Sequence, residues 1–86
     1  MRASHKAVFD ALVEAQKQRS ARTDWHDYEM QAVMSKVNEL RAAKGLATMA
    51  LLELQRVEAM ACGHVDYTSK FALYAGELAD GLEVSP

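Results

Sequence analysis

Residues that break helices are rare in this 86-residue chain and stand at only a few positions. The only proline is the last residue, Pro86, and the four glycines are at positions 45, 63, 76 and 81. Because proline and glycine tend to end helices, this placement predicts long uninterrupted helical stretches. No stretch alternates apolar and polar residues for more than a few positions, as a half-buried strand does. The sequence therefore predicts an all-α protein.

Start and stop signals predict four helices, over residues 4–21, 24–44, 47–62 and 66–80, with a short acidic tail over 81–86. Ser4, Thr23 or Asp24, and Asp66 are residue types that cap the start of a helix. Gly63 is predicted to end the third helix, and the alternative is one long helix kinked there. A chain of this length is predicted to be a single domain, residues 1–86. We expect a compact bundle of three to four short helices, with self-association as one way to complete its small core.

Helical wheels place an apolar face on each predicted helix. The second helix carries an additional apolar patch of Trp25, Tyr28 and Ala32, so that it is expected to touch a second neighbour or a partner. The third helix has apolar residues almost all round, which predicts a central position, and Glu53 falls within its main apolar arc. The first helix has alanines at a spacing of four residues, which predicts a close approach of another helix: Ala3, Ala7, Ala11 and Ala15.

Cysteine usage and the length of apolar runs indicate the compartment of the chain. Cys62 is the only cysteine, so an intramolecular disulfide is impossible and a reducing compartment fits best. The first residues mix charged and apolar side chains, unlike a signal peptide, and no run approaches the ~20 apolar residues that span a bilayer. We therefore expect a cytoplasmic protein without a membrane partner.

The charge of the chain is distributed unevenly. Residues 1–45 contain eight Lys and Arg against six Asp and Glu (+2), and residues 46–86 contain two against six (−4), which together give the net charge of −2. Such an asymmetry can orient a partner or pair two copies head to tail. A partner protein and a homodimer are therefore both expected kinds of assembly.

The groups that could carry chemistry do not form a recognised motif. His26 lies one turn from Glu29, but the repeated Glu-x-x-His pattern of di-metal bundles is absent. Cys62 and His64 lie at a predicted turn, where neighbouring side chains point in different directions. A glycine-rich phosphate loop, Cys-x-x-Cys and His-Glu-x-x-His are also absent. The sequence therefore predicts no catalytic residue, metal or cofactor. An enzyme or metal protein that uses His26, Glu29 and Glu53 is the least favoured alternative.

The densest basic segment contains Lys17, Arg19 and Arg22, with Trp25 close behind. Lysine and arginine contact phosphates and an aromatic ring can stack on a base, so nucleic acid is an alternative partner. The net negative charge and the simpler reading of a solvated helix end argue against it. This alternative is a nucleic-acid-associated regulator that acts as a dimer through the basic segment.

Arg22, Trp25 and Tyr28 are the strongest candidates for a protein-binding site, because Arg, Trp and Tyr dominate binding hot spots. A place in the core is slightly favoured for the two rings, and their role in binding depends on their being exposed. Glu53 joins the set as an orienting charge, since a carboxylate within an apolar arc must be paired or open to a partner. The leading hypothesis is a small non-enzymatic interaction protein that binds and regulates or inhibits a partner protein or complex. Adaptors, regulators and phage-type inhibitors share this build by analogy of size.

Overall fold

The computed structural model of the chain describes residues 1–85. Its elements in chain order are α1 (Ala3–Gln16), the 3-10 turn η1 (Arg19–Ala21), α2 (Trp25–Ala43), α3 (Leu51–Ala61) and α4 (Tyr67–Ala79). These residues contain no strand, so the predicted all-α class is confirmed.

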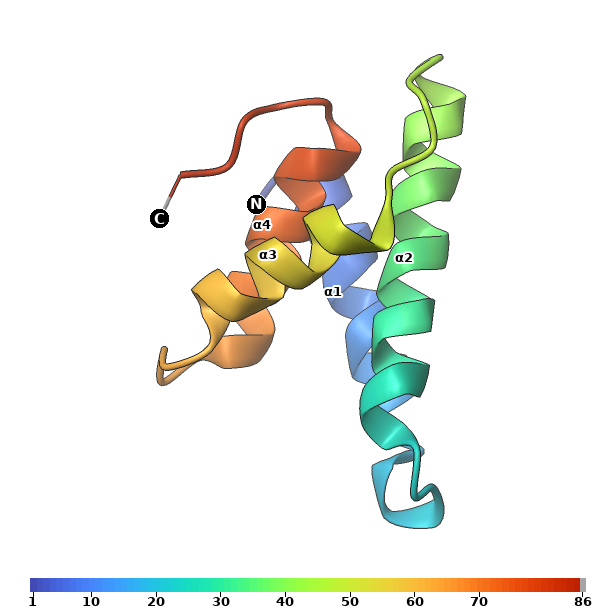
Figure 1. The fold of residues 1–86 in the computed structure, drawn as a ribbon, viewed down its shortest axis with the longest axis vertical. Helices are drawn as coiled ribbons and strands as arrows, with labels where there is room; N and C mark the ends of the chain where they lie inside the picture. Colours follow the sequence, from blue (N-terminus) through green and yellow to red (C-terminus); the bar gives the residue numbers. More distant parts are fainter. Residues whose placement is uncertain (86) are drawn as a thin grey trace.

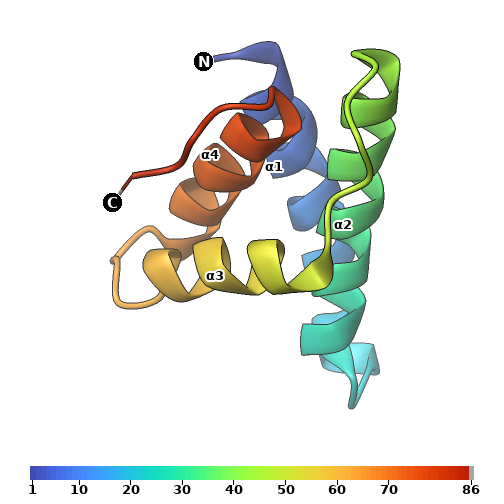
Figure 2. The same cartoon turned by 45° about the horizontal axis from the view of Figure 1, so that its top comes forward.

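The helices form a small bundle around one core. α1 and α4 make the most extensive contact, α2 packs along α1, and α3 crosses in front of them (Figure 1). Figure 2 shows that α3 starts beside α2 and runs away from it rather than along it. The largest fully buried side chains come from all four helices: Val8, Leu12, Val33, Val37, Leu54, Val57 and Phe71. None of the helices over residues 1–85 has both the length and the apolar character that crossing a membrane requires.

The first helix is shorter than the sequence predicts. A helix over residues 4–21 is expected, but α1 ends at Gln16 and the chain turns through Lys17 and Gln18 into η1. The reason is a tertiary contact, because the Arg19 guanidinium binds the Glu29 carboxylate on α2. The chain must turn before Arg19 to make that contact. The helix propensities of the residues in α1 do not predict this turn.

The third helix starts later than the sequence predicts, at Leu51 rather than at residue 47. The segment before it is held in an irregular conformation by polar side chains of α2. Asn38 Oδ1 accepts a hydrogen bond from the Met49 amide at 2.8 Å, and Arg41 Nε donates to the Ala47 carbonyl at 2.7 Å. Since Met49 is also buried, these residues gain more from contact with α2 than from an extra helical turn.

The predicted central position of the third helix is wrong. α3 buries one face, formed by Leu54, Val57 and Ala61, and exposes Leu51 and Leu52 at its start. The predicted apolar arc included residues before Leu51, which are not helical and so do not share the face. α3 is therefore a surface helix that covers the core from one side.

α3 and α4 are separate helices, which settles the choice that the sequence leaves open at Gly63. Gly63 has a φ of +93°, a left-handed conformation that favours glycine and ends a helix. Asp66 then starts α4, and its side chain accepts a hydrogen bond from the Ser69 amide at 3.3 Å. The turn between the two helices reverses the chain so that α4 runs back through the bundle.

Gly76 allows the backbones of α4 and α1 to approach each other closely. A Cβ atom placed on Gly76 would lie 2.8 Å from both the Cα and the amide nitrogen of His5. The sequence predicts a close approach at the alanine stripe of the first helix, but the backbone of Ser4 and His5 makes it. Of the alanine stripe only Ala15 is buried, and it shares the buried face of α1 with Ser4, Val8 and Leu12.

Asp80, just beyond α4, connects three parts of the chain. Its carboxylate accepts a hydrogen bond from the Ser4 hydroxyl at 2.5 Å and lies 3.2 Å from Lys44 Nζ and 3.3 Å from Arg2 Nη1. The hydrogen bond from Ser4, followed by the charges of Lys44 and Arg2, lowers the pKa of the Asp80 carboxyl below its ordinary value. A carboxylate at the C-terminal end of a helix is normally unfavourable, and these partners offset that cost.

We expect Asp80 to make the stability of the fold depend on acid pH. Because its pKa is lower in the folded chain, the ionised carboxylate stabilises the fold above about pH 4, and this contribution is lost as the pH falls through the folded value. Asp80→Asn should lower the free energy of unfolding by about 1 kcal/mol near neutral pH and by much less at about pH 2.5. Urea unfolding of both proteins at the two pH values measures this, and an equal difference at both would contradict it.

Candidate functional site

The two aromatic rings at the start of α2 lie at the surface. Trp25 is 38% exposed and Tyr28 is 36% exposed, and they stand one helical turn apart. The slightly favoured assignment of these rings to the core is therefore wrong. Their exposure follows from α2 extending past the other helices at this end of the bundle (Figure 1).

Arg19 lies over the Trp25 ring and is fixed there by a buried carboxylate. Its Cζ atom is 4.4 Å from the ring centroid. Nε and Nη2 donate hydrogen bonds of 2.7 and 2.8 Å to the two oxygens of Glu29, whose side chain is only 5% exposed. The Glu29 hydrogen bonds raise the pKa of Arg19, so the guanidinium stays charged. A planar cation on an aromatic face is a favourable contact that also limits the motion of both groups.

Arg22 and Tyr28 repeat this arrangement on the open surface. The Arg22 Cζ atom is 4.1 Å from the centroid of the Tyr28 ring, and its Nε and Nη2 each donate a 2.8 Å hydrogen bond to Asp24. The hydrogen bonds from Arg22 lower the pKa of the Asp24 carboxyl. Together with the first pair this forms the arginine–aromatic patch: Arg19, Arg22, Trp25 and Tyr28.

A second network joins α2 to α3 and α4 beside the patch. His26 Nε2 lies 2.5 Å from Glu58 Oε2, and the Tyr67 hydroxyl donates to the same oxygen at 3.0 Å. Burial, and then the neighbouring Glu58 carboxylate, raises the pKa of the Tyr67 hydroxyl, which therefore remains a donor at physiological pH. The Trp25 and His26 rings are nearly perpendicular, with centroids 5.8 Å apart, so the network also contacts the patch.

Two hollows open on either side of the His26 and Glu58 pair, which lines both. The larger one, about 430 Å³, is lined by Arg19, Trp25, His26, Glu58, Cys62, Gly63 and Tyr67. The smaller one, about 250 Å³, lies between α2 and α3 and is lined by His26, Asp27, Met30, Gln31, Leu51, Gln55 and Glu58. The start of α2 is thus flanked by recesses that could receive side chains of a partner.

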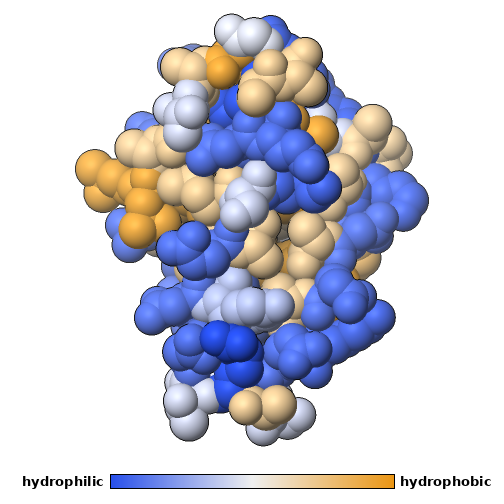
Figure 3. Space-filling model, turned by 90° about the vertical axis from the view of Figure 1, so that its right-hand side faces the viewer, coloured by the Kyte–Doolittle hydropathy of each residue, from blue (hydrophilic) through white to orange (hydrophobic). Residues whose placement is uncertain are grey.

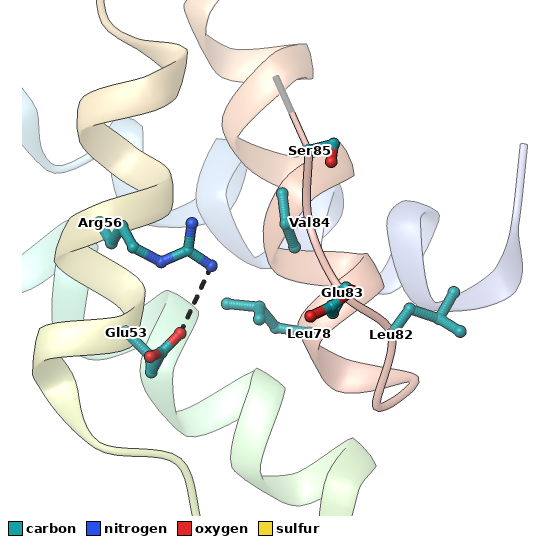
Figure 4. Close-up of a pocket in the computed structure, with 7 residues that line it drawn as sticks. All are labelled: Glu53, Arg56, Leu78, Leu82, Glu83, Val84 and Ser85. Atoms are coloured by element: carbon teal, nitrogen blue, oxygen red, sulfur yellow. Dashed lines mark hydrogen bonds and ion pairs between the residues drawn. The ribbon is translucent and has the colours of Figure 1, made fainter.

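Glu53 does not belong to this site. It is exposed on α3 and pairs with Arg56 at 3.5 Å, in a different pocket of about 480 Å³ formed with the chain after α4 (Figure 4). That pocket shares no lining residue with the hollows beside Trp25. The structure therefore brings Arg22, Trp25 and Tyr28 together but leaves out Glu53, which is exposed and paired with an arginine of its own helix.

The cations of the basic segment are all engaged within the chain. Lys17 pairs with Glu14 at 2.9 Å, and Arg19 and Arg22 form the bidentate pairs described above. A phosphate group would have to compete with these carboxylates. The nucleic-acid alternative stays a prediction, but the local charge on which it depends is largely neutralised.

The residues of the enzyme or metal alternative do not converge. Glu29 binds Arg19, Glu53 binds Arg56, and His26 contacts Glu58 instead of either of them. Over residues 1–85, no group of three His, Cys, Asp or Glu side chains is arranged to hold a metal ion. His26, Glu29 and Glu53 therefore do not share one pocket, as this alternative requires.

Glu58 is the residue of the site that the sequence analysis missed. It lies beside the buried face of α3, and its side chain is 14% exposed because Tyr67 and His26 cover it. The available signal was a carboxylate adjacent to the apolar residues Leu54 and Ala61 on the helical wheel. Its partners, however, come from two other helices and could not be inferred from spacing.

Comparison with known proteins adds nothing to this description. No protein-family model matches the chain, and no curated protein or solved structure matches it either. The function must therefore be argued from the geometry of the site.

Proposed function

We propose that this chain is a non-enzymatic interaction protein that docks the arginine–aromatic patch onto a partner protein or complex and thereby regulates or inhibits it. The build of a small adaptor, regulator or phage-type inhibitor fits this role by analogy. The observation that carries the proposal is the double arginine–aromatic stack on exposed rings at the start of α2.

The patch is suited to binding because its side chains are already ordered. Each guanidinium is held by two hydrogen bonds to a carboxylate while it covers a ring. Immobilising a flexible side chain on binding costs about 0.5–1.5 kcal/mol, and much of that cost is already met here in the free protein. The patch therefore offers Arg, Trp and Tyr, the residue types of binding hot spots, in a fixed arrangement.

The surface around the patch also favours a protein partner. Figure 3 shows the side of the molecule formed by α2, where hydrophilic residues surround smaller hydrophobic areas and a strongly hydrophobic group projects at one edge. Exposed large apolar side chains in residues 1–85 include Leu51 and Leu52 at the start of α3. Apolar anchors within a polar surround are typical of protein interfaces.

Trp25→Ala is expected to lower the recovery of the partner about tenfold when tagged protein is used to capture complexes from lysate of the cell that makes it. The ring is only partly buried, so the variant should remain folded, which circular dichroism would check. Leu82→Ala is the matched control, because Leu82 is 42% exposed but follows α4 at the other end of the bundle (Figure 1). Capture should survive high salt, since apolar contacts are poorly screened.

Nuclease treatment of the lysate separates the two kinds of partner. A defined protein that persists after nuclease and is lost with Trp25→Ala supports docking. The proposal would be overturned if the partner were recovered only with intact nucleic acid, if Lys17→Glu abolished that recovery, and if Trp25→Ala left it unchanged. Binding would then depend on the basic segment. Lys17 suits this comparison because its side chain is exposed and its one ion pair lies on the surface.

A further inference from the structure

The smaller hollow beside the patch, here called the α2–α3 cleft, is lined by acidic side chains but not by lysine or arginine. It comprises His26, Asp27, Met30, Gln31, Leu51, Gln55 and Glu58. Asp27 and Glu58 are its charged residues, and no lysine or arginine is among the lining residues. Leu51 adds apolar surface because its side chain is 44% exposed, whereas Met30 lies at the floor of the cleft and is buried. The cleft thus combines negative charge with uncovered apolar surface.

Both carboxylates have acceptor capacity left. The contacts of Glu58 with His26 and Tyr67 go to the same oxygen, Oε2, and within residues 1–85 Oε1 accepts no hydrogen bond. Oε1 is not fully buried, so it retains some contact with solvent although the Glu58 side chain is only 14% exposed. The Asp27 side chain is 89% exposed, and His26 Nδ1 lies 3.9 Å from its Oδ1. A ligand that donates hydrogen bonds from a positive group would satisfy both.

We propose that the α2–α3 cleft receives a segment of the partner protein that presents a lysine or arginine next to an apolar residue. The positive group donates to Glu58 Oε1 under the influence of Asp27, and the apolar neighbour covers the exposed Leu51 side chain. A charge-assisted hydrogen bond to a largely desolvated carboxylate is stronger than one to an exposed carboxylate, so Glu58 is the main acceptor. This inference rests on the proposed function and specifies the chemistry of the partner.

The position of the cleft supports this occupant. His26 lines the cleft and also faces the Trp25 ring, so a segment in the cleft is continuous with a partner seated on the arginine–aromatic patch. An acidic segment would meet Asp27 and Glu58 as like charges, and like-charge juxtaposition opposes binding. The occupant is therefore basic, and it meets the patch from the side of α3.

The test uses a short probe and the folded protein, and it needs no knowledge of the partner. N-acetyl-Leu-Arg amide is titrated into the ¹⁵N-labelled full chain, alongside the same peptide with the neutral isostere citrulline in place of arginine. The arginine peptide should shift amide signals of the α2 start and α3 and bind at least fivefold more tightly than the citrulline peptide. Glu58→Gln should weaken binding about tenfold, and Asp27→Asn about threefold.

Two controls keep the result interpretable. Glu53→Gln removes a carboxylate of α3 that lies outside the cleft, so it should leave peptide binding unchanged. Because the Asp27 side chain is highly exposed, Asp27→Asn should not disturb the fold. Equal binding of the two peptides, equal binding to Glu58→Gln and wild type, or shifts on another surface would overturn the inference. Shifts of the same signals with protein concentration alone would identify a second copy as the occupant and also overturn it. None of these outcomes bears on the Trp25→Ala capture, so failure of this inference is distinct from failure of the proposed function.

Discussion

Replacing Gly76 with valine is expected to lower the free energy of unfolding by about 3 kcal/mol, and the melting temperature by more than about 10 °C. The first side-chain atom would already lie 2.8 Å from two backbone atoms of His5. Backbone cannot move aside as a flexible side chain can, so α4 would have to separate from α1 along the largest helix contact of the fold. Gly76→Ala should give a smaller loss of about 2 kcal/mol, because the better helix propensity of alanine offsets part of the clash.

Gly63→Ala is the control that separates crowding from backbone strain. A Cβ atom on Gly63 would meet nothing within 4 Å, but the residue has a φ of +93°. Its cost should be the strain of a left-handed alanine alone, about 1 kcal/mol. Thermal and urea unfolding of the four proteins measures the series. If Gly76→Val were no more harmful than Gly63→Ala, the close contact of α1 and α4 would be contradicted.

Arg19→Met is expected to destabilise the fold by about 2–3 kcal/mol, because it leaves the nearly buried carboxylate of Glu29 without its partner. Methionine retains a long apolar stem that can still cover Trp25, so the loss reports mainly on the ion pair. The estimate is below that for a fully buried pair, since the Arg19 side chain is 44% exposed and partly screened by water. Urea unfolding at neutral pH provides the measurement.

A double-mutant cycle with Glu29→Gln tests whether the pair is the cause. Once Glu29 is neutral, Arg19→Met should cost much less than in the wild type, which corresponds to a coupling energy above about 1 kcal/mol. Arg22→Met is the matched control, because its pair with Asp24 lies on the surface, and it should leave the urea midpoint nearly unchanged. Additive effects of the two changes at Arg19 and Glu29 would rule out the pairing as the source of stability.

The helix count and the turns of the fold could be predicted from local chemistry. Gly63 adopts the left-handed conformation that ends α3, and Asp66 caps α4 with its own side chain. Both depend on a residue and its immediate neighbours, so the sequence displays them directly. Where a helix boundary is set by another helix, as at Gln16 and Leu51, local signals fail because the deciding contacts come from α2.

Only some of the residues of the candidate site could be predicted from the sequence. Arg22, Trp25 and Tyr28 stand out by residue type, and the structure places them together. The reason for their exposure could not be read from the wheel, since it depends on how far α2 extends beyond its neighbours. The sequence suggests a phosphate contact for Arg19, but in the structure this side chain binds Glu29. Glu58 contacts His26, 32 positions earlier in the chain, and Tyr67, 9 positions later.

The pairing of α1 with α4 also determines how the chain can fold during synthesis. α1 makes its largest contact with α4, the described helix that lies farthest from it along the chain, so part of the buried face of α1 stays uncovered until α4 has been synthesised. Closing a loop of that length must come before the contact is gained, which slows folding relative to bundles whose neighbours pair in sequence. Synthesis of α4 is therefore the step after which α1 can complete its native packing.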